Sequence, residues 1–199
     1  MTNLADRPNS PRGDRRREQL VAAGIAVLRD DGWQGVTTRA VAQRAGTNPG
    51  LIHYHFGGLA GLHTAIFRQA TELILGPLVT ELLEAADERA ALATVRRLLP
   101  QATGDDQTTR LAAELIAGAT RDPALGVVLR DELRQARALI ADRLRGARPG
   151  WTTDRRDGVA TLVVAAIDGL MLHYMIDGDL PVGAALSAVE DLLATPDPS

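Results

Sequence analysis

The sequence predicts an all-α protein, and three observations indicate this fold class. Apolar residues recur at intervals of three and four through most of the 199 residues, as they do on the buried face of a helix. No segment alternates apolar and polar residues over a useful length between turn signals, which is the pattern of a half-buried strand. Glycine and proline stand between the periodic segments, where helices end. We therefore expect a chain of helices without a β-sheet.

The N-terminal part of the chain is expected to hold an arm and four helices. Residues 1–13 are polar and contain proline, so we predict a disordered arm. A first helix over 14–32 begins with an aspartate that can cap it and ends at a glycine. Two short helices follow within 37–56, and a fourth covers 59–75. The Gly-Pro pair at 76–77 is expected to interrupt this fourth helix, because proline has no N–H to donate.

The remaining residues continue the helical pattern. The expected helices cover 78–100 as one or two segments, 111–119, 123–146, 153–177 and a shorter segment that starts near Pro181. Residues 101–108 have the composition of a loop. The sequence therefore predicts a small N-terminal helical unit followed by a larger helical domain.

Residues 37–56, TTRAVAQRAGTNPGLIHYHF, are the most informative segment of the chain. Thr37 can cap a first short helix through its side-chain oxygen. Gly46 supplies the backbone freedom for a tight turn, Asn48 can cap the second helix, and Pro49 suits its first position. Two helices that meet at a steep angle across such a turn form a DNA-reading unit. The segment therefore predicts a helix-turn-helix.

Charge is distributed unevenly along the chain, and the overall net charge of −3 conceals this. Residues 1–68 carry nine arginines against five acidic residues, whereas residues 69–199 carry 13 arginines against 20 acidic residues. The part with a net charge of +4 thus contains the helix-turn-helix, and the part with −7 does not. A basic surface at the DNA-reading unit is expected if phosphates are bound there.

Other functional classes find little support in the sequence. The chain has no cysteine, which excludes disulfides, thiol catalysis and thiolate metal sites. His53 and His55 cannot share a metal ion on a helix, because residues two apart diverge by about 200°. No nucleophile motif, Gly-rich phosphate loop or carboxylate pair stands out, so we expect neither an enzyme nor a cofactor. The apolar run 161–176 is too short to span a bilayer, and no secretory signal is present, so a cytoplasmic protein without a membrane segment is expected.

The last two helices predict a second subunit. The apolar residues of 153–177 spread over more than one face of the helix, which is wider than one core requires. We predict that this helix and the terminal one pack against their copies in a homodimer. The alternative is a helix at the centre of one subunit. The residues expected in the dimer interface are Leu162, Ala166, Leu170, Val182, Leu186 and Val189.

These features together resemble the TetR family of bacterial transcriptional regulators. The residues that carry the resemblance are Gly32-Trp33, Val36-Thr37-Thr38-Arg39, Val41-Ala42, Ala45-Gly46, Asn48-Pro49-Gly50, Ile52, Tyr54-His55-Phe56 and Leu62. The resemblance implies a three-helix DNA-binding domain over 14–74 and a helical ligand-binding and dimerisation domain over 75–199. It also implies a homodimer that binds a palindromic double-stranded DNA operator and responds to a small-molecule effector, most simply as a repressor that the effector releases.

The resemblance also assigns roles to individual residues. It places the DNA-binding residues at Thr37, Thr38, Arg39, Asn48, Pro49, Gly50, Leu51, His53, Tyr54 and His55. Arg39 is the first choice for reading a base, because an arginine that binds guanine through two hydrogen bonds contributes roughly 1 to 3 kcal/mol of discrimination. Ile52 and Phe56 are expected in the core, and Trp33 is expected to pack between the first and second helices.

The sequence departs from the family at two places. His53 stands where the family commonly has a tyrosine, and Leu59 with Ala60 stands where a Lys-Glu pair is frequent. The tip of the second helix of the motif, residues 49–51, also offers few hydrogen-bonding side chains. These departures keep an alternative function open: a helical ligand-binding or protein-interaction module that has lost operator recognition.

Overall fold

The structure is a computed structural model that describes residues 11–103 and 106–194. Within this part of the chain there are helices and no strands, which confirms the predicted all-α fold. The helices are α1 (Pro11–Gly35), α2 (Thr38–Arg44), α3 (Gly50–Phe56), α4 (Leu59–Glu84), α5 (Glu88–Thr103), α6 (Asp106–Arg121), α7 (Pro123–Ala147), α8 (Thr153–Ile176) and α9 (Val182–Ala194). The predicted arm lies outside the described residues up to position 10, and residues 11–13 are helical.

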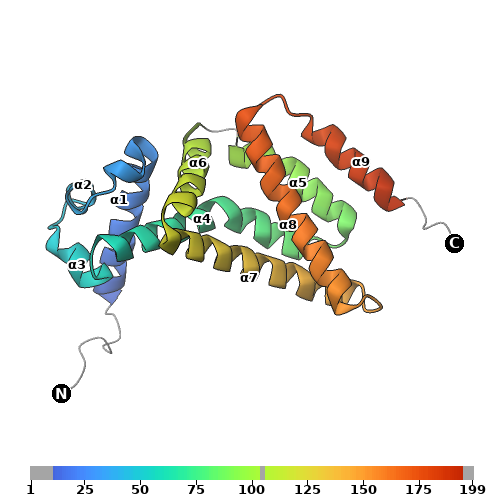
Figure 1. Cartoon of the computed structure of the whole chain (residues 1–199), viewed down its shortest axis with the longest axis horizontal. Coiled ribbons are helices and arrows are strands. Elements are labelled where there is room, and N and C mark those ends of the chain that lie inside the picture. The colour runs from blue at the N-terminus through green and yellow to red at the C-terminus, as the bar shows by residue number, and fades with distance from the viewer. Residues whose placement is uncertain (1–10, 104–105, 195–199) are drawn as a thin grey trace, which may run out of the picture.

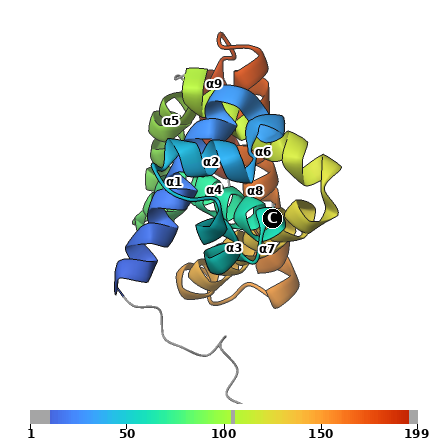
Figure 2. The same ribbon diagram turned by 90° about the vertical axis from the view of Figure 1, so that its left-hand side faces the viewer.

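The helices form a small group and a larger group that share α4 (Figure 1). Helices α1, α2 and α3 pack together at one end of the molecule around the beginning of α4. Figure 2 looks onto this end, with the other helices behind it. Helix α4 then continues into the larger group, where it packs on α5, α6 and α7, and α8 packs on α5 and α7. The small group thus presents α2 and α3 away from the rest of the chain.

The small group encloses a continuous apolar core. Leu20 and Leu28 of α1, Ile52 of α3 and Ile66 of α4 are completely buried in it. Helices α1 and α4 approach closely at Gly24, where an added Cβ atom would lie 2.2 Å from Ile66 Cδ1. Burial of this kind stabilises by roughly 1.5 to 3 kcal/mol per large side chain, so the core fixes α3 against α1 and α4.

The regular part of helix α1 ends at Gly32, the stop that the sequence predicts, and a kink at this glycine separates it from the last residues up to Gly35. Gly32 has φ 68° and ψ −176°, and a short turn then leads to Gly35. A left-handed φ is accessible to glycine without steric penalty, which explains the stop at this position. The turn places Trp33 and Val36 next to the larger group of helices.

The predicted interruption of the fourth helix at 76–77 is wrong. Helix α4 continues through Pro77 to Glu84. Pro77 is exposed, so the carbonyl of Leu73 that loses its helical donor lies on a side of the helix that water can reach. Solvation of that carbonyl lowers the penalty of an internal proline, and tertiary packing of the buried residues Ile74 and Leu78 supports the helix on both sides.

The predicted loop at 101–108 is also too long. Helix α5 includes residues 101–103, and α6 already begins at Asp106 rather than at Leu111. The polar composition that suggested a loop belongs in part to the ends of these two helices. Sequence composition does not separate these cases, because helix termini and loops use the same polar residues.

Helix α8 spans Thr153–Ile176, which matches the helix predicted over 153–177 and extends beyond the apolar run 161–176. By length and composition it is able to cross a membrane, which the shorter run 161–176 was not expected to do. One side of α8 is buried, at Ala160, Val164, Ile167 and Met171, where it packs on α5 and α7. Its other side is exposed and carries the large apolar residues Leu162, Leu172 and Ile176 together with Asp168 and His173.

We expect Pro77→Ala to stabilise the protein. The substitution restores a backbone donor for the Leu73 carbonyl and removes the residue least compatible with a helix interior. Because Pro77 is exposed, little burial is lost. The free energy of unfolding in urea should rise by about 1 to 3 kcal/mol. A decrease would show that the local geometry of α4 requires proline.

Candidate nucleic-acid interface

The turn between α2 and α3 is built by short-range hydrogen bonds. Thr37 caps α2, since its Oγ1 accepts a hydrogen bond from the Ala40 amide at 3.1 Å. Gly46 has φ 61°, a left-handed conformation that glycine adopts readily. The Asn48 Oδ1 atom accepts a hydrogen bond from the Gly50 amide at 2.7 Å and so caps α3. The predicted helix-turn-helix is therefore present, with α3 as its second helix.

One side of α3 is fixed in the core, and the other side is open to solvent. Ile52 is completely buried, whereas the Tyr54 side chain is 81% exposed. Gly57 ends the helix with φ 71° and donates its amide to the His53 carbonyl at 3.0 Å. Because Ile52 cannot rotate away, the directions of His53 and Tyr54 are set by the packing of the helix.

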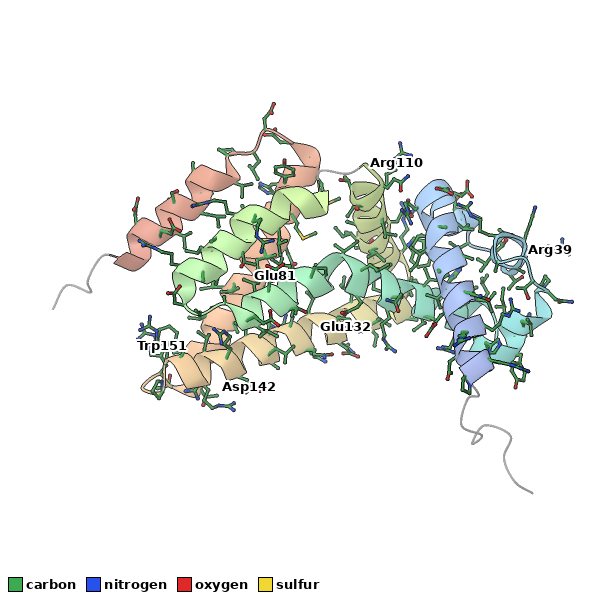
Figure 3. The ribbon with its side chains drawn as sticks, turned by 180° about the vertical axis from the view of Figure 1, so that it is seen from behind. Arg39, Glu81, Arg110, Glu132, Asp142 and Trp151 are labelled. Atoms are coloured by element: carbon green, nitrogen blue, oxygen red, sulfur yellow. The ribbon has the colours of Figure 1, made fainter. Side chains whose placement is uncertain are left out.

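The predicted DNA-binding residues are not equally accessible. Those exposed are Thr37, Arg39, Asn48, Pro49, Gly50, His53 and Tyr54, while Thr38, Leu51 and His55 are half-buried. Leu51 packs against the core, which limits the apolar contact expected of it. Figure 3 shows Arg39 at the outer end of the molecule, pointing away from the other helices. The exposed set comes from α2, the turn and α3, and so forms one outward surface.

Arg17 of α1 supports the end of α3, a role that the sequence analysis missed. Its guanidinium donates to the His55 carbonyl at 2.8 Å and lies 4.6 Å from the centre of the Phe56 ring. Nothing in the spacing of the arginines at the start of α1 indicates a partner 38 residues away. Arg17 thus holds the C-terminal end of α3 and brings positive charge beside it.

His55 has an electrostatic environment that favours its neutral form. Partial burial lowers the pKa of its imidazole from the ordinary value, and the nearby positive charges of Arg17 and Arg16 lower it further. The neutral imidazole is therefore favoured over the charged form at this position. It meets the Tyr54 ring edge to face at a centroid distance of 4.9 Å. His55 accordingly contributes shape and hydrogen-bonding capacity to the surface more than charge.

A metal site does not arise from the histidines of α3. Among residues 11–103 and 106–194 the structure groups no three His, Cys, Asp or Glu side chains in a way that could hold an ion. The chemistry of the surface is instead that of an interface: the exposed Arg39 of α2, polar and aromatic groups on α3, and the arginines at the start of α1.

Trp33 does not pack between α1 and α2, as the sequence analysis predicted. Its ring stacks on Phe67 of α4 at 6.2 Å and meets His63 at 5.2 Å. Its indole Nε1–H donates to the Glu114 carbonyl of α6 at 2.7 Å, and its backbone N–H donates to the Glu114 carboxylate at 3.2 Å. Trp33 therefore joins α1 to α4 and α6. The prediction failed because the partner residues lie far away in the sequence.

Further contacts strengthen the attachment of the end of α1 to α4 and α6. The His63 ring lies 3.0 Å from the Val36 carbonyl, measured from Nε2. The Arg29 guanidinium donates to the Gln107 side chain at 2.7 Å. Gly118 leaves room for the indole, because a Cβ atom at this position would lie 2.5 Å from Trp33 Nε1. The helix-turn-helix is thus attached to the larger domain through α6 as well as through α4.

The residues predicted for a dimer interface differ in how far they are exposed. Leu162 of α8 is 70% exposed, and Ala166 and Val189 are also exposed. Val182 and Leu186 of α9 are buried within the same chain, where α9 packs on α5. Leu170 is half-buried against the core. The helical period identified both faces of α8 and α9 without distinguishing the internal face from the external one.

The fold and the exposed surface define a class of protein: a helical DNA-binding regulator with an N-terminal helix-turn-helix and a larger C-terminal domain. Comparison with known families agrees. Residues 20–66 match the bacterial regulatory proteins of the TetR family, and residues 86–196 match the C-terminal domain of the BetI-type transcriptional repressor. The chain therefore belongs to the TetR family of transcriptional regulators.

Individual relatives support the same assignment over nearly the whole chain. The HTH-type transcriptional regulator BetI of Rhizobium meliloti strain 1021 is 27% identical over 177 residues, which cover 88% of this chain and 86% of the relative. The crystal structure of a transcriptional regulator from Streptomyces coelicolor A3(2) matches with a TM-score of 0.76 and 27% identity, over 91% of this chain and 99% of that one. The multidrug binding protein EbrR, complexed with imidazole, matches with a TM-score of 0.70 and 25% identity, over 100% and 99%.

These matches establish the function at the level of the family. The protein is a DNA-binding transcriptional regulator. The matches give no support to the alternative of a module that has lost operator recognition.

We expect Trp33→Phe to destabilise the protein. A phenyl ring can still stack on Phe67, but the Glu114 carbonyl loses its donor, so the free energy of unfolding should fall by about 1 to 3 kcal/mol. Trp151→Phe is the matched control, because the Trp151 ring contacts the guanidinium groups of Arg148 and Arg155 in the turn before α8. The control should change stability by less than about 1 kcal/mol. Equal effects of the two substitutions in urea unfolding would contradict the role given to Trp33.

Proposed function

We propose that the protein is a homodimeric repressor that binds a palindromic operator and is released by a small molecule bound in the helices of the C-terminal domain. The observation that carries the proposal is the double attachment of the helix-turn-helix, through α4 and through the Trp33 contact with α6. A change in the C-terminal domain that moves α6 against α4 would turn the DNA-reading surface. Such a regulator acts where the DNA is, in the bacterial cytoplasm.

The exposed surface of α2 and α3 suits the major groove of DNA. Arg39 is the longest hydrogen-bonding side chain on it and can reach a guanine edge with two donors. Thr37, Tyr54 and His53 offer hydrogen bonds to phosphates around it. The arginines at the start of α1 add positive charge next to the end of α3. We assign base reading mainly to Arg39, because Pro49 and Gly50 at the tip have no side-chain donors.

The exposed side of α8 suits a second copy of the chain. Leu162, Leu172 and Ile176 are 70%, 44% and 79% exposed, and they recur at helical spacing. Ala165 and Gly169 lie between them and would let another helix approach closely. An apolar strip of this kind is unfavourable in water, so the proposed dimer buries it against the same strip of the partner, with Val189 of α9 at its side.

The dimer supplies a geometric mechanism for release. Two recognition helices read half-sites roughly 34 to 36 Å apart, one turn of DNA. An effector that binds better to a conformation with a different separation shifts the population toward it and weakens operator binding. EbrR has been crystallised with imidazole and with proflavin, which supports a small-molecule site in this fold.

We expect Arg39→Ala to weaken operator binding by about 1 to 3 kcal/mol, because a base contact through two hydrogen bonds is lost. The measurement is fluorescence anisotropy with DNA from upstream of the protein's own gene, over a range of salt concentrations. Arg145→Ala is the control: Arg145 lies at the far end of α7 and pairs with Asp142 at 2.7 Å. The proposed function fails if the unmodified protein forms no sequence-dependent complex at low salt.

We expect Leu162→Glu to convert the dimer into a monomer. The substitution places a charge within the proposed apolar contact, where it cannot be solvated. The mass in solution should halve in light scattering, and operator affinity should fall with it because two half-sites are no longer bound together. Val127→Glu on α7, where the valine is 43% exposed, is the matched control and should stay dimeric. A monomeric unmodified protein, or a dimeric Leu162 variant, would overturn the interface.

A further inference from the structure

Thr71 of α4 stands out among the buried residues. It is 5% exposed, and it is the one polar side chain among the buried residues of the part that the structure describes. Its hydroxyl oxygen is completely enclosed and has no hydrogen-bond partner. Buried polar groups are almost always paired, because an unpaired one loses its bonds to water without replacement. An enclosed hydroxyl without a partner in a native core therefore needs an explanation.

Other threonines within the helices show how the hydroxyl is usually satisfied. Thr64 of α4 donates to the Ala60 carbonyl at 3.1 Å, and Thr161 of α8 donates to the Asp157 carbonyl at 2.8 Å. Each of these partners lies four residues earlier, as is common for threonine in a helix. Thr71 makes no such bond. Its hydroxyl is directed into the core without the local partner that the same helix gives to Thr64.

The surroundings of Thr71 restrict what could bind there. Phe67, Thr71, Ile74 and Leu78 recur at helical spacing and are all at most 7% exposed, so they form one buried strip of α4. The other three members are hydrophobic and belong to the core cluster. A charged group placed beside this strip would lose its hydration without a counter-ion. An apolar molecule with a single hydrogen-bonding group would instead satisfy the hydroxyl and leave the rest of the strip covered.

We propose that Thr71 is the polar anchor of the effector site and that the effector is an uncharged, mainly apolar molecule whose hydroxyl or carbonyl group hydrogen-bonds to the Thr71 hydroxyl. The proposal rests on the proposed function, which places a small-molecule site in the C-terminal domain. It deepens that function by naming the contact residue and the chemical class. To enter, the effector displaces side chains of the core that surrounds this strip.

The position of Thr71 connects this site with the DNA-binding domain. Phe67 lies one helical turn earlier on the same strip, and its ring stacks on Trp33. Trp33 in turn is hydrogen-bonded to Glu114 of α6. A molecule that inserts beside Thr71 therefore lies one helical turn from Phe67, whose ring stacks on Trp33 and so helps to attach α1. Binding there and release of the operator are coupled through two side-chain contacts.

The first test needs no ligand. Thr71→Val keeps the shape of the side chain and removes the unpaired hydroxyl, so the midpoint of thermal unfolding should rise. Thr64→Val is the matched control on the same helix: it removes a hydroxyl that has a partner, and its midpoint should stay unchanged or fall. A fall in the Thr71 variant as large as that of the control would show that the hydroxyl is satisfied, and it would overturn the proposal.

The second test measures the hydrogen bond to a bound molecule. The probes are p-cresol and toluene, which differ by one hydroxyl group, and their dissociation constants are determined by methyl NMR on the full-length protein. The unmodified protein should bind p-cresol about 3- to 10-fold more tightly than toluene, the range of one hydrogen bond. Thr71→Val should remove this preference, and Thr64→Val should retain it. Absence of p-cresol binding, or a preference that survives in the Thr71 variant, overturns the proposal.

The third measurement distinguishes the proposed uncharged effector from a cationic one. It also shows whether the repressor function fails independently of the Thr71 site. Proflavin is the cationic probe, and the residue substituted is Asp168 of α8, whose carboxyl pKa is raised by partial burial. If proflavin alone binds, and Asp168→Asn abolishes its binding, the effector site is a cation site and the proposal is overturned. Operator binding without any probe is recorded for every variant. Loss of operator binding by the unmodified protein refutes the repressor function but leaves the NMR result on Thr71 standing.

Discussion

The contact of Trp33 with Glu114 is the interaction on which the arrangement of the two groups of helices depends. Helices α2 and α3 reach the larger group only through α1 and α4, and a single helix would leave them free to swing. The indole and the backbone amide of Trp33 bind two different oxygens of Glu114, so both the position and the orientation of α1 are fixed. Gly118 makes this possible because it leaves room for the ring.

Helix α4 serves both groups, and its residues reflect this double role. Its first half closes the apolar core of the small group with Leu62 and Ile66, which are completely buried. From its middle onward, α4 carries a buried but unpaired hydroxyl at Thr71 and an internal proline at Pro77. These two features lower local stability in a helix that is otherwise strongly packed. Regions that change conformation for function are commonly drawn from such less stable segments.

Features that depend on residues close together in the sequence were predicted correctly, whereas features that depend on distant residues were not. The caps at Thr37 and Asn48 and the stop at Gly32 depend on neighbours within four residues, and the structure has each of them as expected. The helical period likewise identified α7 and α8. The position of Trp33 was wrong because its partners lie up to 81 residues away. Val182 was expected in the dimer interface but is buried within its own chain. The helical period identifies an apolar face, but it does not say whether the same chain or a second one covers that face.

The two tryptophans of the chain differ in their surroundings, and this has a consequence for observing the protein. Trp33 lies half-buried between α4 and α6 with its indole N–H bonded to a carbonyl. Trp151 lies in the turn before α8, far from the small group of helices (Figure 3), beside Arg148 of the same turn and Arg155 of α8. Indole emission depends on polarity and hydrogen bonding, so the two side chains emit differently. The unlabelled protein therefore contains an optical reporter at the place where its two groups of helices meet.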